Sequence, residues 1–362
     1  MRCHLSLSSD GGESFTEQLI DWGTPDLPKC NAPYVDIGPK GEVIIGATLA
    51  RDIPNGTPPD APHYGRVVFR SSEDWGKSWS PSQSVIATGD EDKFAANPAV
   101  PDQAKRTPWD GARGIVDPQS GTIFVSGGFP APPGEDLHSQ RFYRASTDDG
   151  KTWGPIRAFA SEGWIQRWDG HMIAAHGRLA ITYLAHTVPK PGVECLCLVF
   201  ATGEGDAKEL KRHFVATVDN FDMLVHYPPL AADPRRKGTY AIAIVEKGKA
   251  APSLFVTSDD GDHWATASLP APEGVVKATR PAIAYSAKGD VIVLWRGERA
   301  DRTFDEYIAA SRDGKSFGPA VRVTSQSSHI PEAYLKDYSV RGDFLNDLVA
   351  DANYAHASWT DW

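Results

Sequence analysis

A short turn-forming motif recurs along the chain and constrains the fold more than any other feature of the sequence. It reads Ser/Thr-x-Asp-x-Gly-x-x-aromatic, and its clear copies are Ser8–Phe15, Ser72–Trp79, Ser146–Trp153 and Thr257–Trp264. A worn fifth copy, Ala310–Phe317, keeps Gly314 and the aromatic residue and is interpreted as lacking the first hydroxyl and the first Asp. The Asp can accept backbone N–H bonds, the Gly permits positive φ, and the aromatic residue packs beneath the turn. These segments predict structural turns rather than catalytic ones.

A second repeated unit consists of two apolar strands joined by a tight turn. Its copies span 34–47, 114–126, 172–184, 230–245, 282–295 and 345–359. Apolar runs of this length bounded by Gly, Pro, Asp and Asn indicate strands. The long interval between Gly150 and Gly261 fits a unit without the turn motif, built from Cys195–Ala201 and Phe214–Val218 around a short helical insert at Asp206–His213.

The two ends of the chain complement each other in this pattern. Residues 1–20 read as an outer hairpin without its inner strands, and residues 343–362 read as an inner hairpin without its outer strands. Joining them would remove the open edges of a ring of sheets. The sequence therefore predicts an all-β fold and a single domain over residues 1–362. The domain is a six-bladed β-propeller of four-stranded blades, with the last blade closed by the N- and C-terminal strands.

Charge and composition exclude several classes of function. The 362 residues include 37 basic and 47 acidic side chains, for a net charge of −10, which disfavours nucleic acid as the main partner. No stretch approaches the ~20 consecutive apolar residues of a membrane span. The first residues lack the apolar core of a signal peptide, so we expect a cytoplasmic protein or the trimmed form of a secreted one.

Metal, nucleotide and disulfide signals are weak. The sequence contains no His-x-x-x-His, Cys-x-x-Cys or Gly-rich phosphate loop, so no metal and no cofactor is expected. Its four cysteines, Cys3, Cys30, Cys195 and Cys197, do not make a disulfide scaffold in a chain of this length. Cys195 and Cys197 are expected to be buried thiols because neighbouring positions on one strand face make a poor disulfide.

The repeated turns resemble the Asp boxes of the sialidase (neuraminidase) superfamily, a group of six-bladed propellers. The run GEVIIGATLARD followed by VVFRSSEDWGKSWS also resembles the first blade of a sialidase. At the level of repeats, the resemblance covers nearly the whole chain. It implies an enzyme in which three arginines clamp a carboxylate, an Asp serves as acid/base, and a Tyr activated by a Glu is the nucleophile.

The residues that the resemblance implies are only partly present. Asp52 or Asp60 stands near the place of the acid, Arg280 stands where the blade-five arginine belongs, and Tyr338-Ser339 resembles the nucleophile. The chain departs from the family pattern at two places. It reads Asn31-Ala32-Pro33 where the family has Arg-Ile-Pro, and His226-Tyr227 where the family has its Glu and another Arg.

The loops that enter each inner hairpin or leave its second strand are expected to share the face opposite the repeated turns. These loops carry Asn31, Arg51, Asp52, Arg113, Trp168, Asp169, His171, His186, His226, Tyr227, Arg280, Arg296, Arg341 and Asp343. Guanidinium, imidazole and phenol groups suit binding of a carboxylate sugar and proton transfer. His171 and His186 are expected at one rim beside His226-Tyr227, which resembles the His, Tyr and Arg sets of propeller polysaccharide lyases. The alternative for each single residue is a structural role.

Three hypotheses of function follow. The leading one is a sialidase-like exo-glycosidase that acts on an acidic glycan. The alternatives are a lyase of uronate polysaccharides and a non-catalytic propeller that binds glycans or proteins. The expected catalytic residues are Asp52, His171, His186, Tyr227 and Tyr338. The expected substrate-binding residues are Arg51, Arg113, Trp168, Asp169, His226, Arg280 and Arg341.

Overall fold

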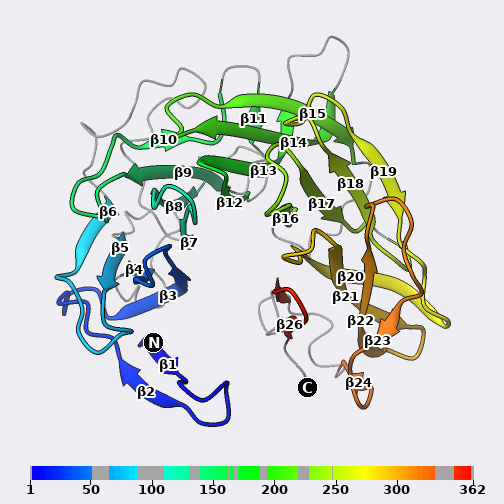
Figure 1. Cartoon of the computed structure of the whole chain (residues 1–362), viewed down its shortest axis with the longest axis horizontal. Coiled ribbons are helices and arrows are strands. Elements are labelled where there is room, and N and C mark those ends of the chain that lie inside the picture. The colour runs from blue at the N-terminus through cyan, green and yellow to red at the C-terminus, as the bar shows by residue number, and fades with distance from the viewer. Residues whose placement is uncertain are drawn as a thin grey trace, which may run out of the picture. The chain divides into compact units, whose positions relative to one another are not determined.

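The computed structural model describes residues 2–50, 65–87, 110–130, 139–161, 164–166, 170–187, 194–218, 228–246, 248–330 and 346–359. All regular secondary structure in these residues is β-strand, and they contain no helix (Figure 1). The expectation of an all-β fold is confirmed. No helix in the described part of the chain is long and apolar enough to cross a membrane.

The chain divides into two compact units. The first contains Met1–Asp169, His176–Leu179 and Gly203–Leu210, and the second contains Gly170–Ala175, Ala180–Thr202 and Lys211–Trp362. We describe each unit by itself.

The first unit contains a two-stranded sheet and two four-stranded antiparallel sheets. The pair is β1 (His4–Leu7) with β2 (Thr16–Leu19). The next sheet has the order β3 (Lys29–Ile37), β4 (Val43–Ala50), β5 (Gly65–Ser72) and β6 (Gln83–Ala87). The third has the order β7 (Asp110–Val116), β8 (Ile123–Pro130), β9 (Ser139–Ser146) and β10 (Arg157–Ala158). The short strand β11 (Ile165–Gln166) also belongs to this unit.

The second unit repeats the same order of strands. Strand β12 (His171–Ala175) pairs with β13 (Arg178–Thr187), which is followed by β14 (Glu194–Glu204) and β15 (Lys211–Thr217). The next sheet has the order β16 (Leu230–Ala232), β17 (Tyr240–Ile244), β18 (Ser253–Thr257) and β19 (Ala265–Ser268). Strands β20 (Val275–Tyr285), β21 (Val291–Arg299), β22 (Thr303–Ser311) and β23 (Val321–Arg322) form another, with β24 (Ser328–His329) on β22. A last pair is β25 (Asp347–Ala350) with β26 (Ala355–Ser358).

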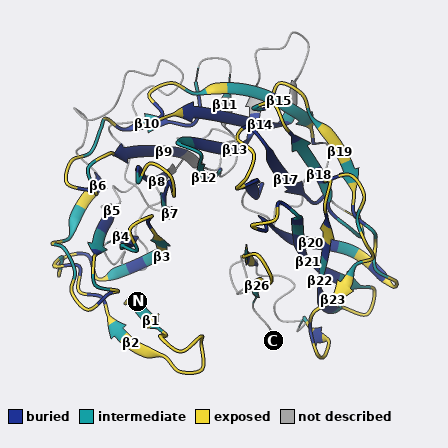
Figure 2. Cartoon of the chain, in the orientation of Figure 1, coloured by how far each residue is buried: buried dark blue, intermediate teal, exposed yellow. Residues whose placement is uncertain are grey.

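The inner hairpins expected from the sequence are confirmed as strand pairs, and most extend further than expected. Strand β20, for example, begins at Val275 rather than at Ala282. The inner strands β4, β17, β20 and β21 carry long runs of buried residues, whereas β2 and β19 are largely exposed (Figure 2). This difference places the hydrophobic core at the inner strands, as continuous apolar runs indicate.

The expected helix at Asp206–His213 is wrong. The chain there makes a turn at 205–207 and enters β15 at Lys211. Gly205 and Ala207 have φ of 59° and 52°, in the left-handed region, which a right-handed helix does not admit. The flanking segments Cys195–Ala201 and Phe214–Val218 lie in or next to strands, as expected.

The repeated turns, which we call Asp turns, share one hydrogen-bond pattern. In the copy at Ser72, the Asp74 Oδ1 accepts the Ser72 hydroxyl at 2.8 Å and the backbone N–H of Ser78 at 2.8 Å. The Ser78 hydroxyl donates to the second Asp74 oxygen at 2.6 Å, and the N–H of Gly76 donates to Ser72 Oγ at 2.7 Å. The copies at Ser8 and Ser146 repeat these contacts, and the copy at Thr257 repeats them with the His263 ring in place of the second hydroxyl. The Asp therefore closes each turn, as expected.

The fifth Asp turn corrects the interpretation of the sequence. Ser311 donates to Asp313 at 2.9 Å, and Asp313 accepts the N–H groups of Lys315 and Ser316 at 2.8 Å. The hydroxyl and the Asp are thus both present. This turn has one residue fewer between Asp and Gly than the other four copies, so the motif begins at Ser311 and not at Ala310.

The Asp turns predict a loss of stability in acid. Hydrogen bonds from the Ser78 side chain, the Ser78 backbone and Ser72 lower the pKa of Asp74 from 3.8 to about 2. Because the pKa is lower in the folded state, the ionised carboxylate stabilises the fold above pH 3.8, and this contribution is lost as the pH falls towards 2. At pH 6, Asp74→Asn should unfold at a lower urea concentration than the parent. At pH 2, the difference between the two urea midpoints should be smaller. Glu73→Gln, the exposed neighbour in the same turn, is the control and should leave the profile unchanged. An equal deficit of Asp74→Asn at both pH values would contradict this account.

Three of the Asp turns, at Gly150, Gly261 and Gly314, pack against the third strand of the preceding sheet. A methyl group added at Gly150 would lie 2.5 Å from Phe69 of β5, and one at Gly314 would lie 3.1 Å from Val256 of β18. The motif's aromatic residue joins the same contact, since the rings of Trp153 and Phe69 are 5.2 Å apart in an edge-on arrangement. The conserved spacing of the motif therefore specifies a contact between sheets as well as a turn.

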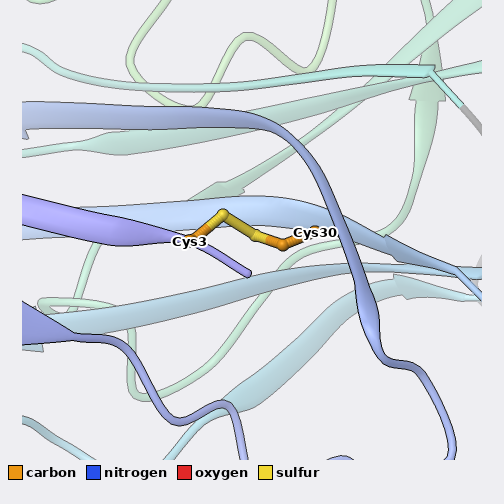
Figure 3. Close-up of a disulfide and its surroundings, with 2 residues drawn as sticks. All are labelled: Cys3 and Cys30. Carbon is orange, nitrogen blue, oxygen red and sulfur yellow. A yellow bond between two sulfur atoms is a disulfide. The ribbon is translucent and has the colours of Figure 1, made fainter. Parts of the chain in front are cut away.

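Disulfides differ from the expectation. Cys3 and Cys30 form a disulfide with a Cα–Cα distance of 5.7 Å, which ties the start of the chain to β3 (Figure 3). Cys197 is also disulfide-bonded, so the expected buried thiol there is wrong. That expectation assumed a regular strand, whereas the pairing of β14 with β15 shifts register between Leu198 and Val199.

Candidate functional site

The inner hairpin turns and the Asp turns lie at the same end of a sheet. The N–H of Asp260 in an Asp turn donates to the carbonyl of Gly238 in the inner turn at 3.0 Å. A methyl group at Gly41 would likewise lie 3.7 Å from Trp75. The starts of the innermost strands are therefore at the other end of each sheet, which we call the site end.

A β-bulge recurs at the site end of three sheets. On β3 it falls between Asn31 and Tyr34, on β7 between Asp110 and Arg113, and on β20 between Thr279 and Ala282. In each case two residues of the innermost strand oppose one residue of the second strand. Bulges re-aim side chains and are frequent beside functional sites.

Arg280 occupies the bulge of β20. Its φ is 51°, in the left-handed region that non-glycine residues seldom adopt, and Ala32 has φ of 44° at the equivalent place on β3. Both residues precede a proline. The register therefore aligns Arg280 with Ala32, and the first sheet has no arginine at this place.

The Arg280 side chain is buried among polar groups of its own sheet. It is 5% exposed, and its Nη1 lies 3.3 Å from Thr279 Oγ1, a fully buried hydroxyl. Its carbonyl accepts a hydrogen bond of 3.1 Å from Asn346 Nδ2. A guanidinium in such a setting is shielded from water, which strengthens its hydrogen bonds to a carboxylate.

Glu306 lies at the centre of this group. Its Oε1 accepts from Arg296 Nε at 2.9 Å, and its Oε2 accepts from Asn346 Nδ2 at 2.7 Å. Burial raises the pKa of Glu306, opposed by the charges of Arg296 and Arg280 and by the bonds from Arg296 and Asn346. Asn346 Oδ1 is buried and has no hydrogen-bond partner. We call Arg280, Arg296, Glu306 and Asn346 the site-end cluster.

Arg296 was expected in a loop, but it lies within strand β21. Strand β21 continues to Arg299, and Arg296 is fully buried beside Glu306. Its guanidinium carbon lies 3.9 Å from the centre of the Phe304 ring, a cation–π contact. The Arg296 side chain therefore makes its contacts inside the sheet.

A second buried carboxylate, that of Asp305, lies on the opposite face of β22 from Glu306. Asp305 accepts from Thr324 at 2.7 Å, from Arg299 at 2.6 Å and from Ser327 at 3.0 Å. Burial opposes its ionisation, yet these hydrogen bonds hold the pKa of Asp305 below its usual value. All of its partners are on its own sheet or on the segment that follows, so its role is structural.

His171 opens β12 and is half-buried. Its Nδ1 accepts the backbone N–H of Leu230 at 3.1 Å. A neutral His171 ring therefore carries its proton on Nε2, which leaves it a hydrogen-bond donor on that side. This bond ties the starts of β12 and β16 together.

Arg113 belongs to the first unit and lies on β7 just after the bulge, opposite Ser126 of β8. It is half-buried. Register aligns it with Tyr34 and Ala282 rather than with Arg280. The two arginines thus hold different places in their sheets, although the sequence pattern treats them alike.

The other expected site residues lie wholly or partly outside the described part of the chain. Those outside the described residues are Arg51, Asp52, Trp168, Asp169, His226, Tyr227, Tyr338, Arg341 and Asp343. His186 is placed on β13, with its side chain outside the description. No group of three or more potential metal ligands occurs among the residues that the model describes.

Glu306 and Asn346 were absent from the expected site. A charged pair, Asp305-Glu306, inside an otherwise apolar strand is the signal in the sequence that marks a buried polar group. No comparable signal marks Asn346.

No protein-family model matches the chain. No curated protein sequence matches it either. Among solved structures, it is similar to the Hadza microbial sialidase Hz136, with a TM-score of 0.52 and 14% identity over 93% of this chain and 65% of that one. It is also similar to the intramolecular trans-sialidase of Ruminococcus gnavus, with a TM-score of 0.51 and 11% identity over 90% and 88% of the two chains.

A leech intramolecular trans-sialidase gives a TM-score of 0.54 and 11% identity over 98% of this chain and 69% of that one. The chain spans less than two thirds of the Hadza sialidase. At these identities the likeness concerns the fold, and the chain has the fold of the sialidases. The resemblance read from the repeated turns is confirmed at that level.

Proposed function

We propose that this protein is a glycosidase that removes an acidic sugar from the end of a glycan. Two observations support the proposal: the sialidase fold and the placement of Arg280. The placement of Arg280 is the observation on which the proposal mainly rests. A left-handed bulge residue holds a guanidinium at the site end of its sheet, within a buried hydrogen-bonded cluster. Backbone strain of this kind clusters at functional sites.

The carboxylate of the sugar is the group that Arg280 would bind. The planar fork of a guanidinium matches the two oxygens of a carboxylate, and each charge-assisted bond contributes about 1.5–3 kcal/mol. Arg341, Arg113 and Arg51 are proposed as further contacts to the substrate, with Trp168, Asp169 and His226. By resemblance to sialidases, Asp52 is proposed as the acid/base and Tyr338 as the nucleophile.

The lyase hypothesis receives less support from His171. A lyase base must accept the C5 proton of a uronate, and His171 Nδ1 already accepts from Leu230. His186 and Tyr227 remain candidates for proton transfer.

We further propose that the strands form six blades, with β1–β2 as the outer half of the blade whose inner half is β25–β26. In the first unit, Arg144 of β9 donates to the Val85 carbonyl of β6 at 2.7 Å, and Arg70 of β5 donates to the Asp21 carbonyl just after β2 at 2.5 Å. Strand β2 thus takes the place that an outermost strand takes elsewhere. A methyl group at Gly76 would also lie 2.9 Å from Leu7 of β1, which matches the contacts of Asp turns with third strands.

A matched pair of substrates tests the proposed function. We expect the purified protein to cleave an aryl glycoside of an acidic sugar, such as a sialic acid, and to act at least tenfold more slowly on its methyl ester. The ester removes the negative charge and leaves the rest of the sugar in place. Equal rates on acid and ester would count against recognition of the carboxylate.

A further inference from the structure

The carbonyl of Arg280 is held by a side chain from a distant part of the sequence. Asn346 Nδ2 donates both to this carbonyl, at 3.1 Å, and to Glu306 Oε2, at 2.7 Å. The next residue is Pro281, which has no N–H to add to the ladder at the bulge. The conformation of Arg280 is therefore tied to the orientation of one amide.

We infer that Glu306 is a positioning residue that fixes the backbone of Arg280 through Asn346. The inference rests on the proposed function for its role in substrate binding. Glu306 faces two donors, Arg296 Nε and Asn346 Nδ2, and an ionised carboxylate can accept from both at once. This arrangement orients the Asn346 amide so that its nitrogen, and not its oxygen, meets the carbonyl of Arg280.

Glutamine at position 306 would break this arrangement with almost no change of shape. Its single oxygen can accept from Arg296 or from Asn346, and its NH₂ group then faces the other donor. If that donor is Asn346, the amide must turn to present Oδ1, which places an oxygen against the Arg280 carbonyl oxygen. A buried guanidinium without an acceptor costs more than a neutral amide without one, so the glutamine oxygen is expected to face Arg296 and the NH₂ group to face Asn346. The turned Asn346 amide then releases the left-handed conformation of Arg280.

Asp305→Asn provides a matched control. Asp305 is the adjacent residue on β22, equally buried and also held by an arginine and two hydroxyls, but it faces away from the site-end cluster. A purely structural role for Glu306 would make the two variants alike. Asn346→Ala is a second test variant because it removes the bridge and leaves the Arg296–Glu306 pair in place.

The experiment compares the parent, Glu306→Gln, Asn346→Ala and Asp305→Asn as full chains, well below their melting temperatures. The inference predicts that Glu306→Gln and Asn346→Ala lower kcat/KM for an acidic aryl glycoside at least tenfold, chiefly through KM, while Asp305→Asn stays within twofold. In arginine-labelled protein, the NMR signal of Arg280, assigned from Arg280→Lys, should move in the first two variants only.

Two results would overturn the inference. One is full activity of a folded Glu306→Gln or Asn346→Ala, and the other is an equal loss in Asp305→Asn. If the parent acts on no acidic glycoside, the proposed function is wrong, but the positioning role of Glu306 can still be tested. The NMR signal of Arg280 is then the only readout for that role. An unmoved signal then refutes the positioning role, and a signal that moves in both test variants but not in the control supports it.

Discussion

Replacing Arg280 with lysine should lower kcat/KM for an acidic glycan by ten- to a hundredfold, and replacing it with alanine should lower it further. Lysine keeps the charge but lacks the planar fork, so one of two charge-assisted bonds is lost. At about 1.5–3 kcal/mol per bond, and a factor of ten for each ~1.4 kcal/mol, this loss corresponds to the stated range. The neutral methyl ester should respond much less.

Arg302→Lys is the matched control for this substitution. Arg302 lies in the same unit and also has a left-handed φ, of 70°, but it is exposed in the turn between β21 and β22. Its substitution should leave kcat/KM unchanged. Thermal unfolding of each variant separates lost binding from lost folding. Full activity of a folded Arg280→Lys would refute the carboxylate contact.

Removing the N-terminal hairpin should have the largest effect on stability. Residues 1–20 contain β1 and β2 and the Cys3 half of the disulfide. Without them, the proposed last blade loses its outer strands, and an open strand edge promotes aggregation. We expect the chain lacking residues 1–20, with Cys30→Ser, to unfold without a sharp transition and to aggregate on heating.

The effect of the disulfide must be measured separately. Its partners are 27 residues apart, so the loop-closure model assigns it about 3.5 kcal/mol. The full chain with Cys3→Ser and Cys30→Ser should lose about that amount and still unfold cooperatively. A truncated chain that melts like this double variant would contradict the closure.

The repeated elements were the most predictable part of the molecule. The hairpins and Asp turns depend on local periodicity and on turn residues such as Asp74 and Gly76, which the sequence displays directly. Errors arose where local conformation overrode the pattern. Left-handed residues 205 and 207 replaced a helix, and a one-residue deletion hid the hydrogen bonds of Ser311 and Asp313.

The site was less predictable because it depends on contacts between distant segments. Arg280 was identified, but its partner Glu306 lies 26 residues further on and is brought near by the register of β20, β21 and β22. Asn346 lies a further 40 residues along the chain from Glu306. Without that register, the sequence pattern placed the buried Arg296 in a loop.

Product analysis on a panel of acidic glycans tests the central claim most directly. The panel should contain sialylated oligosaccharides, uronate polysaccharides and their neutral counterparts, and each digest should be followed by chromatography of the products, reducing-end content and ultraviolet absorbance. The account predicts release of an acidic monosaccharide with a new reducing end and no gain in absorbance. An unsaturated uronate that absorbs in the ultraviolet would show a lyase, and binding without any product would show a non-catalytic propeller; either result would contradict the account.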